Sequence, residues 1–115
     1  MVPDPLSEVF AALSDPTRRA IVARLVDGDL AVHQLTTPFG ISQPAISRHL
    51  KVLERAGLIS RSRQATTRLS HLEPEPLKGA IDWLARYQAL WDERYDQLDA
   101  LLASIQGQTP ENGAS

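Results

Sequence analysis

Three polar side chains recur every four residues near the middle of the chain, at Gln43, Ser47 and Lys51. Residues at this spacing share one face of a helix. Ser42 followed by Pro44 is a typical helix start, with Ser42 as the expected N-cap. Glutamine, serine and lysine side chains hydrogen-bond to base edges and phosphates, and a helix fits the major groove of DNA. The pattern therefore predicts a helix face whose chemistry suits nucleic acid.

The opposite side of this segment carries Ile46, Leu50 and Leu53, also at helical spacing. We expect these residues to face a core, which leaves Pro44 and Arg48 beside the polar face. A short helix and a turn precede the segment, an order typical of a helix-turn-helix. An amphipathic helix with an ordinary solvated surface is the alternative at this point.

The distribution of charge favours the nucleic-acid interpretation. The 115 residues contain 12 Lys and Arg against 14 Asp and Glu, for a net charge of −2. Residues 41–71 carry six of the cations and one acid, whereas the segments on either side are net acidic. A basic segment that coincides with a helix-turn-helix is the electrostatic footprint expected of a DNA-binding protein. Its cations are Arg48, Lys51, Arg55, Arg61, Arg63 and Arg68.

Residue types that other chemistries need are missing or scattered. The chain has no cysteine, which excludes disulfides, thiol catalysis and zinc sites that contain cysteine. The histidines His33, His49 and His71 are far apart, and neither a glycine-rich phosphate loop nor a Ser/His/Asp trio is visible. We expect no enzyme activity, no cofactor and no metal. No secretory signal or long apolar run is visible, so we expect a cytoplasmic protein without a membrane partner.

The residues that begin and end helices and form turns predict a mainly α (α+β) fold. The expected elements are helices over residues 6–13, 16–26, 31–36 and from 42 to a left-handed cap at Gly57, strands over 58–63 and 67–72, and one long helix to about Ile105. We expect one domain over residues 1–106 and a disordered tail over 107–115.

Three stretches of the chain resemble a known family. Residues 12–21 read ALSDPTRRAI, residues 41–53 read ISQPAISRHLKVL, and residues 56–59 read AGLI. In these stretches, and over nearly its whole length, the chain resembles the ArsR-type winged-helix bacterial transcriptional repressors. The resemblance implies a winged helix-turn-helix with a two-stranded β-hairpin wing and a long C-terminal dimerisation helix. It further implies homodimers that bind double-stranded operator DNA, repress their own operon and dissociate when an inducer binds.

The resemblance also implies roles for individual residues. Gln43, Ser47, Arg48 and His49 correspond to groove-facing residues, and Ser42 and Lys51 to phosphate contacts, with Pro44 beside them. The wing contacts correspond to Arg61, Arg63 and Arg68. The hairpin tip lacks the glycine common in the family, so the reach of the wing is an open point.

The metal-sensing motifs of this family are absent. Metal-sensing members carry Glu-Leu-Cys-Val-Cys-Asp-Leu in the third helix, whereas residues 29–35 here read DLAVHQL. A second family site uses histidines of the last helix, and this chain has none there. Soft metals need cysteine or clustered histidine ligands, so we expect a metal-independent member whose effector is unknown. His33 near Asp29 is better interpreted as a solvent-exposed histidine than as half of a ligand set.

Apolar residues continue at heptad spacing from Leu77 to Ile105, with Gln88 as the one polar exception. A stripe of this length calls for a partner helix, and a helix of about 30 residues is about 45 Å long. A small-molecule pocket lined by aromatic residues at the dimer interface is an alternative. We expect a homodimer whose interface includes Leu6, Phe10, Ile81, Leu84, Trp91, Tyr95, Leu98 and Leu102. A winged-helix protein-interaction module that does not bind DNA is the competing hypothesis.

Overall fold

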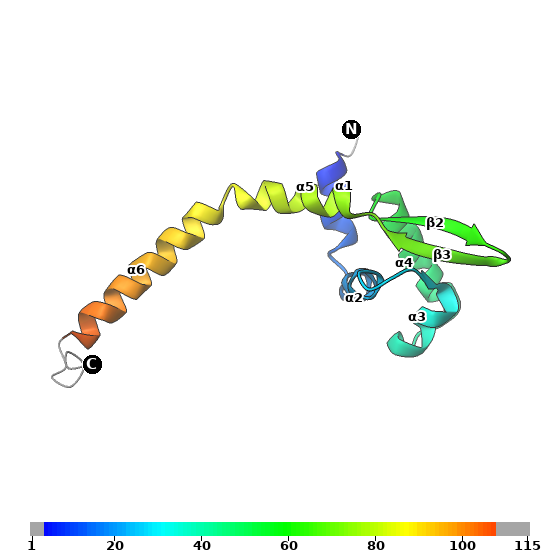
Figure 1. Cartoon of the computed structure of the whole chain (residues 1–115), viewed down its shortest axis with the longest axis horizontal. Helices are drawn as coiled ribbons and strands as arrows, with labels where there is room; N and C mark the ends of the chain where they lie inside the picture. Colours follow the sequence, from blue (N-terminus) through cyan, green and yellow to red (C-terminus); the bar gives the residue numbers. More distant parts are fainter. Residues whose placement is uncertain (1–3, 108–115) are drawn as a thin grey trace. The chain divides into compact units, whose positions relative to one another are not determined.

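The computed structural model describes residues 4–107. The chain divides into two compact units, one ending at Ile81 and the other beginning at Asp82. The elements run in the order α1 (Pro5–Ala12), α2 (Pro16–Leu25), β1 (Leu30–Ala31), α3 (Val32–Phe39), α4 (Gln43–Arg55), β2 (Ile59–Gln64), β3 (Thr67–Leu72), α5 (Pro74–Ala85) and α6 (Gln88–Gln106) (Figure 1). The tail expected from residue 107 lies, apart from Gly107, outside the described residues.

Helices α1, α2 and α4 begin in the same way, with an acceptor side chain followed by proline in the first turn. The carboxylate of Asp4 accepts from the Ser7 amide at 2.8 Å, and that of Asp15 from the Arg18 amide at 3.0 Å. The Ser42 hydroxyl accepts from the Ala45 amide at 3.3 Å. Each cap satisfies an amide that has no partner inside the helix. The predicted start of the fourth helix at Ser42 is confirmed.

The core of the first unit lies between its helices and the base of the sheet. The stripe predicted on α4, Ile46, Leu50 and Leu53, is fully buried. Ile21 of α2 and Leu35 of α3 are buried with it. Gly57 has a φ of 77° and ends α4 in the left-handed conformation, as predicted. This packing fixes α4 against the unit and leaves its polar side free.

The sheet has one strand more than the sequence indicates. β2 and β3 form the predicted antiparallel hairpin, and β1 pairs with β3 through Leu30 opposite Ser70 and Ala31 opposite Leu69. A two-residue strand has too little alternation to be recognised in a sequence, so the sequence does not predict β1. β1 ties the middle of β3 to the start of α3, which follows β1 directly in the chain (Figure 1).

Helix α3 extends further than predicted. The sequence indicated an end at Thr36 because Pro38 breaks most helices. In the structure the helix includes Pro38 and ends at Gly40, whose φ is 64° and whose amide donates to the Thr36 carbonyl at 2.9 Å. The left-handed glycine, rather than the proline, terminates this helix.

The single long helix predicted at the C-terminal end is interrupted. α5 ends at Ala85 and α6 begins at Gln88, so the heptad stripe is also divided. The Arg86 and Tyr87 amides donate to carbonyls three residues earlier, at 3.3 and 3.0 Å, which tightens the chain into a turn. No glycine or proline lies between Ala80 and Gln106 to signal the break.

The second unit consists of the end of α5, the turn and α6. The rings of Trp83 and Tyr87 meet edge to face with centroids 5.3 Å apart across the turn. No residue of α6 is buried. α6 is a long C-terminal helix, as the predicted fold class includes. Its large apolar side chains are exposed to solvent in the single chain. Within residues 4–107, no helix is both long and apolar enough to cross a membrane.

Candidate nucleic-acid interface

Helix α4 presents most of the predicted contact residues on its free side. The inward stripe of Ile46, Leu50 and Leu53 determines which side this is. The exposed residues there are Gln43, Pro44, Arg48 and Lys51, with Ser42 at the cap and Ser47 half-buried among them. The first turn is also the positive end of the α4 helix dipole, and a helix N-terminus favours anions. One helix therefore combines base-reading side chains with an N-terminus suited to phosphate.

The side chain of His49 does not lie on the free side of α4 but beside the start of α2. Its Nδ1 lies 3.4 Å from Nη1 of Arg18 and 3.9 Å from a carboxylate oxygen of Asp15, and its side chain is 23% exposed. Both neighbours belong to the start of α2, so His49 packs inside the first unit. The Arg18 amide and the charges of His49 and Arg18 hold the pKa of Asp15 below its ordinary value. This geometry does not support the assignment of His49 to the groove-facing residues, because helical spacing alone cannot distinguish the border of a polar face from its centre.

Arg18 has a structural role that the sequence did not indicate. Its Nε donates to the Ala12 carbonyl at 2.6 Å, and Nη2 donates to the Ala11 carbonyl at 3.3 Å. These carbonyls lie at the C-terminal end of α1, where backbone oxygens lack partners inside the helix. Arg18 therefore joins α1 to α2 while it also contacts His49 of α4.

The hairpin of β2 and β3, called the wing below, gathers three arginines on one face. Arg63 lies directly opposite Arg68, and Arg61 is two residues from Arg63 on the same strand. Residues opposite one another, or two apart on one strand, share a face of the sheet. Like charges placed directly opposite destabilise a strand pair. The wing thus maintains a repulsive pair that an anion would relieve.

A cavity of about 370 Å³ lies where the wing, the start of α3 and the start of α4 meet, and it is called the wing pocket below. The structure therefore brings together four predicted residues, Gln43, Ser47, Arg61 and Arg68, whereas Arg63 does not line the cavity. The Nε of Arg61 is buried and has no hydrogen-bond partner among the described residues. The full lining is Ala31, Val32, His33, Gln43, Ser47, Arg61, Thr66, Thr67 and Arg68.

Three polar lining residues are not among the predicted contacts. His33 was expected to be solvent-exposed, which it is, but it also borders the wing pocket from the first turn of α3. Thr66 and Thr67 border it from the wing. Their hydroxyls and ring nitrogens suit phosphate oxygens. The only signal in the sequence was their position at the start of a helix and at a hairpin tip.

One acidic side chain near the sheet is paired with a histidine. Asp29, in the loop before β1, lies 2.7 Å from Nδ1 of His71 on β3. The hydrogen bond from this pair and the charge of Asp29 raise the pKa of His71. Within the described residues, no group of three or more His, Cys, Asp or Glu side chains is placed to hold a metal ion.

The predicted dimer residues are mostly uncovered. In the first unit Leu6 is half-buried against the core, Phe10 is 37% exposed and Ile81 is exposed. In the second unit all five are exposed: Leu84, Trp91, Tyr95, Leu98 and Leu102. Large exposed apolar side chains gathered on one element are typical of interaction surfaces.

Three antiparallel strands, a helix-turn-helix and a hairpin wing define a winged helix-turn-helix protein, and sequence comparison identifies the family. Residues 15–61 match the bacterial regulatory proteins of the arsR family. The chain is similar to the transcriptional repressor SdpR of Bacillus subtilis, with 37% identity over 82 residues, which are 71% of this chain and 91% of SdpR.

Solved structures agree with this match. A crystal structure of an ArsR family transcriptional regulator is 38% identical, with a TM-score of 0.70 over 77% of this chain and 98% of that one. A solution structure of the homodimeric winged helix-turn-helix DNA-binding domain of Mb0332 from Mycobacterium bovis is 26% identical, with a TM-score of 0.60 over 82% and 84% of the two chains. The chain belongs to the arsR family of bacterial regulatory proteins. Members of this family are transcriptional regulators and not enzymes, so the predictions of family, fold class and absence of enzyme activity are confirmed.

Proposed function

We propose that this protein is a homodimeric, metal-independent repressor that binds operator DNA through α4 and the wing. The observation that carries the proposal is the convergence of the polar face of α4 with Arg61 and Arg68 of the wing on one polar pocket. The most specific feature of this pocket is the buried Nε of Arg61, which lacks a hydrogen-bond partner within the described residues. A buried donor without a partner is costly, and a DNA phosphate would satisfy it.

The two parts of this surface would perform different tasks. Gln43, Ser47 and Arg48 would contact base edges in the major groove, as recognition helices do. Ser42, Lys51 and the wing arginines would bind phosphates, which position the protein without reading sequence. His33 and the threonines of the wing pocket would add contacts to the same phosphate. Pro44 would pack against the backbone beside the helix start.

The exposed apolar residues of α6 support the homodimer. Trp91 and Leu98 are 57% and 50% exposed in the single chain, and a second copy would remove such residues from water. The Mb0332 domain, which resembles this chain over most of its length, is homodimeric. Two copies would place two recognition helices about one helical turn of DNA or more apart, so the operator would be palindromic.

The ligand chemistry of the chain supports metal independence. The segment 29–35 lacks both cysteines of the metal-sensing motif, and the histidines lie outside the last two helices. Without thiolates or clustered imidazoles, a soft metal has no adequate ligand set. Added zinc should leave operator affinity unchanged, and a large release of DNA by zinc would contradict this part of the proposal.

The DNA-binding surface is tested by two substitutions and one control. Fragments selected from genomic DNA with the wild-type protein serve as operator, and affinity is measured by fluorescence anisotropy at fixed salt. Arg48→Ala should weaken binding by about 1–3 kcal/mol and relax specificity at one position. Arg61→Ala should weaken binding to all fragments and reduce its salt dependence. Arg24→Ala, at the exposed end of α2, is the matched control.

Two outcomes would contradict the proposal. If the wild-type protein selects no fragments, the chain is an interaction module that does not bind DNA. If Arg48→Ala and Arg61→Ala bind as tightly as Arg24→Ala does, the contact surface lies elsewhere.

A further inference from the structure

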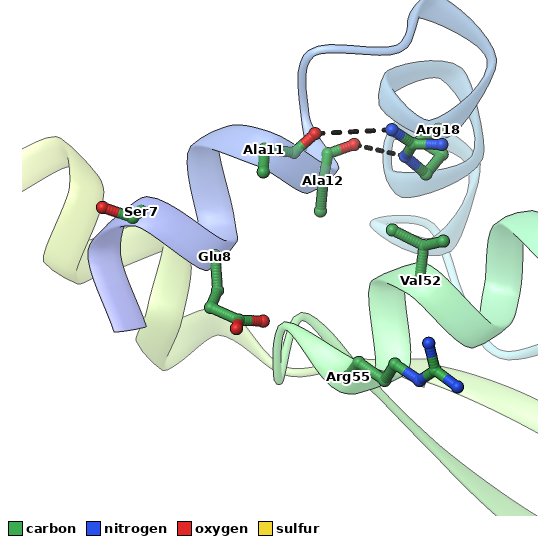
Figure 2. A pocket seen from close by; sticks show the side chains of 7 residues that line it. All are labelled: Ser7, Glu8, Ala11, Ala12, Arg18, Val52 and Arg55. Atoms are coloured by element: carbon green, nitrogen blue, oxygen red, sulfur yellow. Dashed lines mark hydrogen bonds between the residues drawn. The ribbon is translucent and has the colours of Figure 1, made fainter. Parts of the chain in front are cut away.

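A second cavity lies on the helical side of the first unit, between α1, α2 and α4. Its volume is about 420 Å³, within the range of small-molecule sites. It shares no lining residue with the wing pocket. We call it the helical pocket, and Figure 2 shows its lining: Ser7, Glu8, Ala11, Ala12, Arg18, Val52 and Arg55.

The inner wall of the helical pocket is apolar and held in place. Ala11 and Ala12 line it from α1, and Val52 points toward them from α4 (Figure 2). Arg18 closes one end, where its hydrogen bonds to the Ala11 and Ala12 carbonyls occupy its guanidinium. The Ser7 hydroxyl already donates to Asp4 at 2.8 Å. These residues therefore form a surface for an aliphatic group, and most of their polar side-chain groups are already hydrogen-bonded.

Two lining residues of opposite charge, on different helices, are available to bind a ligand. Glu8 extends from α1 toward the cavity, and Arg55 borders it at the end of α4 (Figure 2). Neither side chain forms an ion pair or hydrogen bond with another residue of the described chain, and they do not pair with each other. The pocket thus combines one free carboxylate, one free guanidinium and an apolar wall.

We propose that the helical pocket binds a small aliphatic zwitterion. Its carboxylate would accept hydrogen bonds from Arg55, whose planar guanidinium matches a carboxylate in two-point geometry. Its ammonium group would lie beside Glu8, and its methylene chain would cover Ala11, Ala12 and Val52. A polyanion such as DNA does not suit this site, because Glu8 would repel it.

The position of the pocket gives such a ligand access to the proposed recognition helix. Val52 and Arg55 belong to α4, and Arg18 contacts His49 of α4. An occupant would therefore contact α1, α2 and α4 together and act as an effector if it binds free and DNA-bound protein differently. The role as an effector rests on the proposed DNA-binding function, whereas binding of the zwitterion to the helical pocket does not depend on it.

The test uses the ¹⁵N-labelled full chain without DNA, with ε-aminocaproate as the probe. Its ammonium and carboxylate groups are separated by five methylenes, so its two ends can approach charges on different helices. We expect saturable shifts of the Ala11, Ala12 and Arg55 amide signals at millimolar concentrations. Caproate lacks the ammonium group and hexylamine lacks the carboxylate, so each should bind at least about tenfold more weakly.

Matched variants separate the site from general charge effects. Glu8→Gln and Arg55→Gln should each weaken ε-aminocaproate binding by about tenfold or more. Glu54→Gln, next to Arg55 but outside the pocket, and Arg24→Gln should bind as the wild-type protein does.

Three outcomes would overturn the proposal. The first is the absence of saturable shifts at the pocket amides, and the second is equal binding by Glu8→Gln and wild type. The third is a shift of the same amides with protein concentration alone, which would mean that a second copy of the chain covers the pocket. Because no DNA is present, a failure of the proposed repressor function leaves the result interpretable.

Discussion

Helices α4 and α6 both carry apolar residues at helical spacing, but only α4 buries them against its own chain. Ile46, Leu50 and Leu53 of α4 are fully buried. In α6 no residue is buried, and Trp91 and Leu98 remain at least half exposed. Full burial of a large apolar side chain stabilises by about 1.5–3 kcal/mol. The comparison indicates that the first unit has a core of its own, whereas the apolar side chains of α6 would gain this stabilisation in the proposed homodimer.

The largest expected effect lies in the core. Leu50→Ala should lower the free energy of unfolding by about 2–5 kcal/mol, because it removes buried methyl groups and leaves a cavity. Leu98→Ala is the matched control in α6 and should change the stability of the dilute chain by less than about 0.5 kcal/mol. Urea denaturation at low protein concentration measures both. Equal destabilisation by the two variants would break the distinction between the helices.

Dimer formation tests the proposed role of the exposed apolar residues of α6. Leu98→Asp places a charge in the proposed interface and should raise the dimer dissociation constant by about tenfold or more, since desolvating a carboxylate is costly. Gln97→Asp introduces the same charge one position away and should have a much smaller effect. Sedimentation velocity over a concentration series measures both. A Leu98→Asp protein that assembles as wild type does would show that this face of α6 is not the interface.

A smaller effect is expected at the tip of the wing, far from the core. Gln64 pairs with Thr67, so Ala65 and Thr66 form a two-residue turn, and Ala65 has a φ of 56°. This conformation favours glycine. Ala65→Gly should therefore raise stability by about 0.5–1 kcal/mol in thermal unfolding. Thr66→Gly, which relieves no positive φ, should not stabilise, and a gain there equal to that at Ala65 would contradict the interpretation.

The smallest effect concerns the exposed pair of Asp29 and His71. Because its pKa is raised in the fold, His71 contributes stability below its ordinary value of 6.5 and loses it as pH rises through the higher folded pKa. Asp29→Asn should remove this part of the pH dependence, so it should differ from wild type more at pH 6 than at pH 8.5. Asp27→Asn is the control. An Asp29→Asn protein with the wild-type pH profile in urea denaturation would exclude the pair as its source.

Local patterns predicted the elements that depend on local chemistry. The cap at Ser42, the left-handed Gly57 and the inward stripe of α4 each follow from one or two residue types at fixed spacing. The candidate contact surface followed largely from the same spacing, because burial of one helix face exposes the other.

Features that depend on contacts distant in sequence were not predictable. β1 exists only because β3 pairs with it, and His49 turns inward only because Asp15 and Arg18 lie beside it. The wing pocket requires three segments to meet. The turn between α5 and α6 carries no glycine or proline, and its residues suit a helix as well as a turn. Periodicity describes which face is apolar but not where a neighbouring element lies.

The short strand β1 has a consequence for the order of folding. The turn of the wing joins neighbouring residues, so β2 and β3 can pair early with little loss of chain entropy. Leu30 and Ser70, by contrast, are about 40 residues apart in the chain, and their pairing must wait until α3 and α4 have packed. We therefore expect the wing to form as a free hairpin and to acquire its fixed direction relative to α4 only in the last step of folding.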